Sequence, residues 1–356
     1  MSEPMLNANA IAQHVMETSV SSLAAAGCGV FQRSQRFVDF GGACRVFFDL
    51  ASVTKTVTAW AVLKSGMDPD TPLAQWLPEA SKTPSADVPL ELLLAHRAGL
   101  VPHVPLYAPH APLVHGSPVP LADALRTIAY ARREDASGTL PRGGFPPVYS
   151  DLGYILVGAA LARFLDARDA GEAMTQLVLR PLALHHAIGT ARDLEAQGVD
   201  LATLAAPTES IPWRGGVVHG QVHDDNAWAL TGLGGSGHAG LFGTIEGVVS
   251  LGLAFLDAFL TLDWLVRERP GGTLRAGFDG KSPEGSSAGS HFGPRSVGHL
   301  GFTGTSLWID PDAGVVASLL TNRVHPTRDS MAIRSARPAA HDALFQRALA
   351  LGLGPT

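Results

Sequence analysis

Ser52 and Lys55 form a Ser-x-x-Lys unit with the residue types needed for nucleophilic catalysis. The apolar segment 53–63 predicts a helix, which places the serine at the first turn and the lysine one turn later. Side chains three residues apart on a helix share a face, so the Lys55 amine can reach the Ser52 hydroxyl. A serine hydroxyl becomes a strong nucleophile when a neighbouring base takes its proton. Free backbone N–H groups at a helix start also favour a developing oxyanion.

The same unit has a plainer interpretation, in which Ser52 caps the helix and Lys55 is solvated. Ser-x-x-Lys occurs often by chance, so the spacing alone favours that interpretation. Lys55 lies between Val53, Val57 and Trp60, which indicates a less exposed position than an ordinary surface lysine. The case for chemistry therefore depends on the rest of the chain.

Two further segments carry candidate chemical groups. Tyr149, Ser150 and Asp151 directly precede the apolar helix predicted over 152–166. Tyr149 could simply pack on a loop, and Ser150 or Asp151 could cap this helix. His299 stands on a predicted strand close to several glycines and could be a buried core residue. Glycine within a strand, however, often marks close approach of another group to the backbone.

Taken together, these segments resemble the serine β-lactamase and penicillin-binding protein superfamily, in particular its class C β-lactamase-like branch. That branch carries Ser-x-x-Lys, then Tyr-x-Asn, then Lys-x-Gly or His-x-Gly, and the related motif set is well known. The matching units here are Ser52-Val53-Thr54-Lys55, Tyr149-Ser150-Asp151 and His299-Leu300-Gly301. Segments 92–100, 237–242 and 319–323 also resemble this branch. The resemblance covers nearly the whole chain in the expected order.

The resemblance implies a serine hydrolase that forms an acyl-enzyme on Ser52 and cleaves ester or amide bonds of small molecules or peptides. It implies that Lys55 shares the serine proton and that Tyr149 shuttles it. The backbone N–H groups of Ser52 and Phe302 would form the oxyanion hole. The implied substrate-binding or secondary residues are Asp151, His238, His299, Gly301 and Phe302. A β-lactamase or D-Ala-D-Ala carboxypeptidase is the alternative within the same superfamily.

Two residues depart from the family pattern. Asp151 stands where the family usually has asparagine, and an ionised carboxylate cannot donate a hydrogen bond to a substrate. A carboxylate near Lys55 would also favour the ammonium form. Asp151 therefore turns away as a helix cap, is protonated, or weakens activity. His299 stands where β-lactamases have a lysine, and a mostly neutral imidazole tilts the expected substrate towards esters or amides without a carboxylate.

The pattern of elements predicts an α/β (α+β) fold of the β-lactamase/transpeptidase type. Segments 296–302, 305–310 and 315–321 are predicted strands, and 28–40 is a predicted hairpin around Ser34 and Gln35. Helices are predicted over 9–25, 248–266 and 338–351. The economical architecture is one antiparallel sheet flanked by the terminal helices, with a mostly helical lobe inserted into it. The expected subdomains are 1–65 with 235–356 for the sheet, and 66–234 for the helical insertion.

Composition narrows the function classes. With 46% hydrophobic and only 16% charged residues in 356, the chain is a globular protein rather than a disordered one. A net charge of −6 gives no basic footprint for nucleic acid. Two cysteines are too few for a disulfide framework. Segment 1–17 lacks the pattern of a secretory signal, and Asp257 and Asp263 interrupt the most apolar stretch. We therefore expect a cytoplasmic monomer or weak oligomer without a membrane partner.

Three competing interpretations remain open at this point. Segment 232–237 matches Gly-x-Gly-x-x-Gly, but a dinucleotide site needs a strand directly before it and a helix directly after it. His219 and His223 stand near Asp224 and Asp225 in a polar loop, which is a weak metal pattern. A non-catalytic binding protein on the same fold is the third possibility, because two motif positions are altered. We expect no cofactor and no metal.

Overall fold

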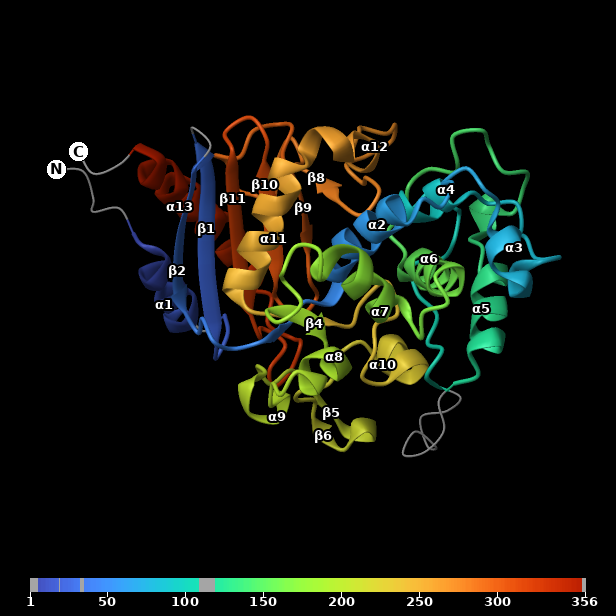
Figure 1. Ribbon diagram of the computed structural model, residues 1–356, viewed down its shortest axis with the longest axis horizontal. Coiled ribbons are helices and arrows are strands. Elements are labelled where there is room, and N and C mark those ends of the chain that lie inside the picture. The colour runs from blue at the N-terminus through green and yellow to red at the C-terminus, as the bar shows by residue number, and fades with distance from the viewer. Residues whose placement is uncertain (1–5, 19, 33–34, 109–118, 354–356) are drawn as a thin grey trace.

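The computed structural model describes residues 6–18, 20–32, 35–108 and 119–353. It places a sheet-rich region beside a helix-rich region, with helix α2 (Thr54–Ser65) running from one towards the other (Figure 1). Within the described residues, the main sheet has six strands in the order β2-β1-β11-β10-β9-β8, and its neighbouring strands pair antiparallel. Its strands are β1 (Ala24–Gln32), β2 (Gln35–Gly42), β8 (Asp279–Gly280), β9 (Val297–Leu300), β10 (Ser306–Asp310) and β11 (Val315–Thr321).

Strand β11 explains why this sheet is covered on both faces. All of its residues are buried, and alternate side chains point to opposite faces. Val316 and Leu320 join the apolar core that contains helix α11 (Ile245–Asp257). Ala317 and Leu319 join a second core with the terminal helices α1 (Ala8–Glu17) and α13 (Ile333–Leu353). The predicted antiparallel sheet flanked by terminal helices is confirmed, as are its three C-terminal strands.

The first helix is shorter than predicted. It ends at Glu17, where the Thr18 hydroxyl donates to the carbonyls of His14 and Val15 at 2.9 and 3.1 Å and so satisfies acceptors of the last turn. The apolar residues from Ala24 onwards, which continue the helical pattern in the sequence, instead form strand β1 and pair with β11. Pairing with a buried strand thus overrides the local helical periodicity. At the other terminus α13 begins at Ile333, earlier than predicted.

The helix predicted over 248–266 is interrupted. Helix α11 ends at Asp257, and a 3-10 turn η7 (Phe259–Leu262) and helix α12 (Asp263–Val266) follow. The segment Phe259–Val266 is bent by 81° from α11. The break exposes Leu260 and returns Leu262 and Leu265 to the core. In the described ranges no single helix is long and apolar enough to cross a membrane, although this bent pair meets the length and composition criteria jointly.

The helix-rich region is built from short elements, most of them between α2 and α11. Its helices are α3 (Leu73–Trp76), α4 (Leu90–Leu94), α5 (Leu121–Tyr130), α6 (Asp151–Phe164), α7 (Ala170–Met174), α8 (Ala191–Ala196), α9 (Leu201–Leu204) and α10 (Asp225–Thr231). Single turns and a π-type turn join them: η1 (Ala51–Val53), η2 (Pro78–Ala80), η4 (Glu134–Ala136), η5 (Thr175–Leu179) and η6 (Pro212–Arg214). Two small sheets complete the described part of the chain. One has the strand order β3 (Phe48–Asp49), β7 (Leu241–Gly243) and β4 (Ile188–Thr190). The other pairs β5 (Ser210–Ile211) with β6 (Gly216–Val217).

Helix α2 lies at the centre of the molecule, and most of its residues are buried on every side. A helix that is buried all round is a core element rather than a surface one, which explains its weak amphipathic pattern. Val57 and Trp60 pack in the large core shared by the two regions. Gly66 ends the helix in a left-handed conformation, as glycine readily does. The residues at the start of α2 are therefore held rigidly between the two regions.

The predicted subdomain boundaries remain a prediction. All main-sheet strands come from segments 24–42 and 279–321, and helices α3 to α10 come from the segment between them. The hairpin turn predicted around Ser34 lies partly outside the described residues. The proline-rich segment 103–120, which the sequence predicts as a long surface loop, is described only in part, because 109–118 are outside the described ranges.

Candidate active site

Ser52 lies in the turn η1, directly before α2, rather than in the first turn of the α-helix itself. Ala51 beside it has a φ of 46°, an unfavourable conformation for a residue with a Cβ. Asp49 holds this turn, because its Oδ1 accepts a hydrogen bond of 2.8 Å from the Ala51 N–H. Strained backbone of this kind clusters at functional sites. The turn presents Ser52 to a cavity of about 630 Å³.

Lys55 is completely buried and makes three hydrogen bonds through its Nζ. The nitrogen lies 2.8 Å from Ser52 Oγ, 2.7 Å from Asp151 Oδ1 and 3.1 Å from the backbone oxygen of His238. An ammonium has three N–H donors, and these three acceptors use all of them. Burial lowers the pKa of Lys55, but the charge and hydrogen bond of Asp151, together with Tyr149, more than offset burial, so that pKa lies above its usual value. Lys55 is therefore held as an ammonium that donates to Ser52.

Asp151 is the first residue of α6, and its carboxylate faces Lys55 instead of capping the helix. Burial opposes ionisation of Asp151, but the Lys55 ammonium and His238 together more than offset burial and hold the pKa of the carboxyl below its usual value. The expectations that Asp151 turns away or is protonated are therefore wrong. Of the three alternatives, the one left is that Asp151 weakens activity by favouring the ammonium form of Lys55, and this stays a prediction.

Tyr149 lies over the same lysine. Lys55 Nζ is 5.1 Å from the centre of its ring, and the ring stacks on His96 at a centroid distance of 4.6 Å. His96 Nδ1 accepts the Ser150 N–H at 3.1 Å, which fixes the backbone next to Tyr149. Burial raises the pKa of the Tyr149 phenol above its usual value, although the Lys55 cation opposes this. Tyr149 is thus a neutral phenol at pH 7, beside the Ser52–Lys55 pair.

The opposite wall of the cavity is the end of β9 and the turn that follows it. Gly301 must be glycine, because a Cβ there would lie 2.0 Å from Thr305 Oγ1 and 2.6 Å from the Leu50 oxygen. Two threonine hydroxyls bind this turn to the backbone before Ser52: Thr303 donates to the Asp49 oxygen at 2.7 Å and Thr305 to the Leu50 oxygen at 3.0 Å.

The two N–H groups expected to form the oxyanion hole belong to Ser52 and Phe302, and both residues line the cavity. Within the described part of the chain, neither N–H donates to a protein acceptor. Free donors beside a nucleophile are the arrangement that stabilises an oxyanion.

His299 is buried and lines the cavity, but it brings no positive charge. Its Nδ1 lies 2.9 Å from the Leu300 oxygen and donates to it, which leaves the proton off Nε2. Burial and the nearby Lys55 cation lower the pKa of His299 to about 3. The imidazole is therefore neutral across the physiological pH range, as the sequence prediction assumed.

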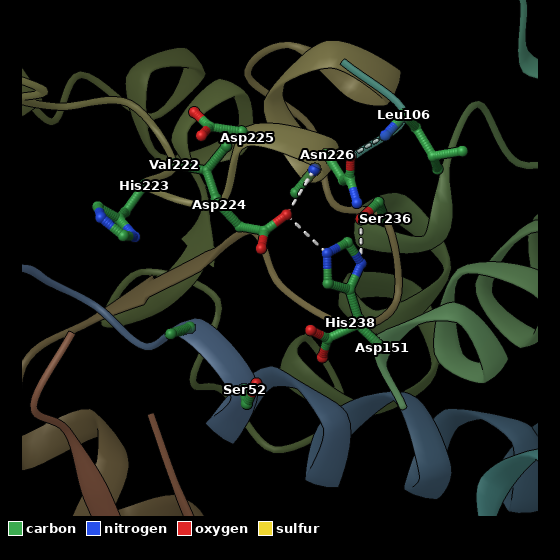
Figure 2. Close-up of polar contacts among 12 residues, drawn as sticks. Ser52, Leu106, Asp151, Val222, His223, Asp224, Asp225, Asn226, Ser236 and His238 are labelled. Carbon is green, nitrogen blue, oxygen red and sulfur yellow. Dashed lines mark hydrogen bonds and ion pairs between the residues drawn. The ribbon is translucent and has the colours of Figure 1, made fainter. Parts of the chain in front are cut away.

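His238 reaches the site mainly through its main chain. Its backbone oxygen accepts a hydrogen bond from Lys55, while its ring lies between Ser236 Oγ and Asp224 Oδ1, each 2.8 Å away (Figure 2). Burial opposes ionisation of Asp224, but His238, the Ala227 N–H and His223 together more than offset burial and lower the pKa of that carboxyl. Thr58 of α2 donates to the Gly237 oxygen at 2.7 Å. The loop 236–239 is thereby fixed over Lys55.

Comparison with known proteins identifies the family. The family model described as Beta-lactamase matches residues 45–341. This chain belongs to the beta-lactamase family. The predicted superfamily, its β-lactamase/transpeptidase-like fold and the assignment to the hydrolases are confirmed. The roles of the individual site residues stay predictions.

Among curated relatives of this beta-lactamase family member, a putative D-alanyl-D-alanine carboxypeptidase of Escherichia coli (strain K12) is 26% identical over 311 residues. That match covers 78% of this chain and 69% of the relative. A protein of the same name from Salmonella gallinarum (strain 287/91 / NCTC 13346) is 28% identical, but the match covers only 50% of this chain and 45% of that protein. The chain thus spans less than half of that second relative.

Among solved structures, EstCE1, a hydrolase with promiscuous acyltransferase activity, aligns with a TM-score of 0.66 at 18% identity. The alignment covers 94% of this chain and 96% of EstCE1. A similarity at this level of identity supports the fold only.

The structure disfavours the metal and dinucleotide interpretations. His219 Nε2 is 2.7 Å from the Ala205 oxygen, and His223 Nε2 is 2.8 Å from Glu209 Oε2, so the two rings have separate partners. Across the residues described, no group of three or more His, Cys, Asp or Glu side chains is placed to hold a metal ion. Helix α10, rather than a strand, ends directly before the glycine-rich segment 232–237.

Sequence reasoning assigned no role to several residues that shape this family member's site. Three of them fix the backbone near the candidate catalytic residues. Asp49 and Thr303 hold the backbone before Ser52. His96 holds the backbone next to Tyr149. Arg323 and Arg337 line the cavity, although they are far from Ser52 in sequence. For His96, its place in segment 92–100, which resembles the family, was a usable signal. Arg323 likewise lies in segment 319–323, whereas for Asp49, Thr303 and Arg337 only the folded chain reveals the contact.

Proposed function

We propose that this protein is a serine hydrolase in which Ser52 becomes acylated and cleaves ester or amide bonds of small molecules or peptides. The observation that carries the proposal is the hydrogen-bonded series Ser52 Oγ–Lys55 Nζ–Asp151 Oδ1, with distances of 2.8 and 2.7 Å, at the edge of the cavity. A serine within hydrogen-bonding distance of a group that can accept its proton is the basis of nucleophilic catalysis.

The proton of Ser52 needs an acceptor, and the ammonium of Lys55 has no free electron pair. In the proposed step, the Lys55 ammonium first loses a proton to solvent, and the free amine then takes the Ser52 proton while Asp151 stays ionised as its counterion. The serine oxygen bonds to the substrate carbonyl carbon at the same time. Tyr149, a neutral phenol next to both residues, donates its proton to the leaving group and regains one from the Lys55 ammonium, which restores the free amine.

The negative charge that develops on the substrate oxygen would be stabilised by the N–H groups of Ser52 and Phe302. Removal of one such donor typically costs about 3 kcal/mol in the transition state. Water then hydrolyses the acyl-enzyme and restores Ser52.

The substrate class rests on the charge of the cavity beside the nucleophile. Lys55 and Asp151 neutralise each other, and His299 is neutral, so this part of the site has no cation for a substrate carboxylate. That favours uncharged acyl esters and amides. A monomeric or weakly oligomeric, cytoplasmic protein remains part of the proposal.

A D-Ala-D-Ala carboxypeptidase or β-lactamase is the second candidate, supported by the names of the curated relatives. One structural feature favours it as well. Arg323 lines the cavity, and its guanidinium lies 4.6 Å from the centre of the Phe302 ring. In the described segments Arg323 has no carboxylate partner and donates only to backbone oxygens. It could therefore meet a substrate carboxylate at the mouth of the cavity.

The test is covalent labelling with a fluorophosphonate followed by peptide mass spectrometry. We expect the label on Ser52, and no label and no hydrolysis of p-nitrophenyl butyrate in the Ser52→Ala protein. Lys55→Ala and Tyr149→Phe should each lower kcat strongly, and the combined loss should be far from additive because the groups act together. Unlabelled wild-type protein would favour a non-catalytic binding protein instead.

A further inference from the structure

The peptide unit between Gly301 and Phe302 has two functional ends. Its N–H, which belongs to Phe302, is one of the two oxyanion donors in the proposed function. Its C=O, which belongs to Gly301, points the opposite way, because the two groups of a trans peptide are antiparallel in one plane. Any group that binds this carbonyl therefore also sets the direction of the Phe302 N–H.

Arg337 binds that carbonyl. Its terminal nitrogen donates to the Gly301 oxygen at 2.7 Å and to the Thr305 oxygen at 3.0 Å. The residue belongs to α13, which packs against the main sheet, and it is only 9% exposed. The same turn is closed by a hydrogen bond of 2.8 Å from the Gly301 N–H to the Thr305 oxygen. Arg337 thus contacts both ends of the turn that carries Phe302.

The charge of Arg337 is uncompensated. No carboxylate of the described segments lies within ion-pair distance of its guanidinium, and its buried Nε has no hydrogen-bond partner. Burial, together with the nearby Arg323 cation, lowers the pKa of Arg337 to about 10, so the side chain is still charged at pH 7. A buried charge without a counterion is costly. Its position is therefore explained poorly by stability alone.

The two carbonyl contacts offer a functional explanation. Hydrogen bonds from a charged donor are shorter and about twice as strong as those between neutral groups. A cation at one end of a peptide also polarises it, because hydrogen bonds in series strengthen one another in a low-dielectric interior. A peptide polarised at the Gly301 oxygen has a more positive hydrogen on the Phe302 nitrogen.

We propose that Arg337 is a positioning residue that orients and polarises the Gly301–Phe302 peptide so that the Phe302 N–H acts as an oxyanion donor. The proposal rests on the proposed function, since it concerns the same oxyanion hole. Thr303 and Thr305 hold the turn from the Ser52 side, through the Asp49 and Leu50 oxygens, and Arg337 holds it from the α13 side. The donor is thus fixed between the nucleophile turn and the C-terminal helix.

The test compares Arg337→Met, Arg337→Gln and Arg337→Lys with wild type on p-nitrophenyl butyrate, and measures the inhibition constant of phenylboronic acid. Arg337→Met removes the donor, Arg337→Gln keeps a neutral donor and Arg337→Lys keeps a charged one. We expect kcat to fall about tenfold or more in Arg337→Met with little change in KM, since a full oxyanion donor contributes roughly a hundredfold or more. The inhibition constant of the boronic acid, whose tetrahedral adduct occupies the oxyanion hole, should rise in parallel.

The matched control is Arg347→Met, which removes another α13 arginine that binds Asp39 away from the cavity. It should change thermal stability without changing kcat or the inhibition constant. If Arg337→Met does not fold, the test is the comparison of the other two variants. We then expect Arg337→Lys to retain more activity than Arg337→Gln, and equal activity of the two would overturn the proposal. A folded Arg337→Met protein with wild-type kcat would also overturn it. So would a rise in KM confined to carboxylate-bearing substrates, because Arg337 would then bind substrate directly.

Failure of this inference can be told apart from failure of the proposed function. Wild-type protein that is labelled at Ser52 but insensitive to Arg337 substitution refutes the positioning role only. Wild-type protein that is not labelled at Ser52 refutes the acyl-enzyme itself.

Discussion

Asp151 Oδ1 lies 2.7 Å from Lys55 Nζ, and the same nitrogen lies 2.8 Å from Ser52 Oγ. The lysine is fully buried, whereas 23% of the Asp151 side chain is exposed. The carboxylate therefore lies between the buried lysine and the cavity that Ser52 also lines. An asparagine in its place would leave Lys55 without a counterion, so this one position sets the charge of the base next to Ser52.

The pH dependence of hydrolysis should reveal this pair. Asp151 raises the pKa of Lys55, so the free amine needed to accept the serine proton becomes abundant only at alkaline pH. We expect kcat/KM of wild type to rise with pH through the alkaline range. Asp151→Asn should move the rising limb to lower pH, because the lysine pKa falls when the carboxylate is removed. A profile that is the same in both proteins would remove Asp151 from the proton path.

The same substitution should reduce stability. Breaking a fully buried ion pair typically costs 3–5 kcal/mol, and the partial exposure of Asp151 reduces this to about 2–3 kcal/mol. Asp257→Asn is the matched control, since its pair with Arg36 is half exposed on both sides and should contribute less than about 1 kcal/mol. Urea unfolding of the three proteins at pH 7 measures both differences.

The sign of the pH effect on this stability follows from the two pKa shifts. The raised pKa of Lys55 gives stability that is fully present below the unfolded lysine pKa of about 10.4 and is lost as pH rises through the folded value. The lowered pKa of Asp151 gives stability present above about pH 3.9 and lost as pH falls through its folded value. The difference between wild type and Asp151→Asn should thus be largest near neutral pH and shrink in acid. A difference that grows in acid would contradict the ion pair.

Local sequence patterns predicted which helices and strands are present better than they predicted the residues at which these elements begin and end. The strand 315–321 was predicted correctly, because every residue is buried and five of the seven, all except Ser318 and Thr321, are apolar. Residues 24–25 were predicted to be helical, because their apolar pattern fits a helix as well as a strand. Only their pairing with β11 makes them part of a strand. Similarly, the motif positions predicted that Ser52, Lys55 and Tyr149 come together. The motif did not reveal the direction of Asp151 or the role of Arg337, because each depends on a contact far away in sequence.

Gly301→Ala should disable the site with little effect elsewhere. The added Cβ would lie 2.0 Å from Thr305 Oγ1 and 2.6 Å from the backbone oxygen of Leu50, and a backbone atom cannot move aside cheaply. The turn that carries Phe302 would move away from the nucleophile. A displacement of a catalytic group by about 1 Å can lower the rate about a hundredfold. Gly138→Ala is the control, because nothing lies within 4 Å of a Cβ there. Activity of Gly301→Ala equal to that of the control would contradict the close approach.

His299 should determine whether the enzyme favours neutral or carboxylate-bearing substrates. In β-lactamases a lysine at this position is a cation, whereas the His299 imidazole, with a pKa lowered to about 3, is neutral and already donates through Nδ1 to the Leu300 oxygen. A charged hydrogen bond contributes about 1–3 kcal/mol more than a neutral one, or roughly a tenfold to hundredfold difference in kcat/KM. We therefore expect wild type to hydrolyse p-nitrophenyl butyrate faster than nitrocefin.

Two substitutions and one mass measurement decide between the substrate classes. His299→Lys should move the preference towards nitrocefin, while His299→Gln, which is neutral, should leave the ratio of the two rates unchanged. Intact mass after incubation with penicillin G should reveal slow acylation without efficient release, since Asp151, the carboxylate bonded to Lys55, is engaged as its counterion and is not free to activate water. Nitrocefin turnover above the ester rate in wild type would instead favour a β-lactamase, with Arg323 at the mouth of the cavity as the group that meets the carboxylate. A ratio that His299→Lys leaves unaltered would mean that residue 299 does not contact the substrate.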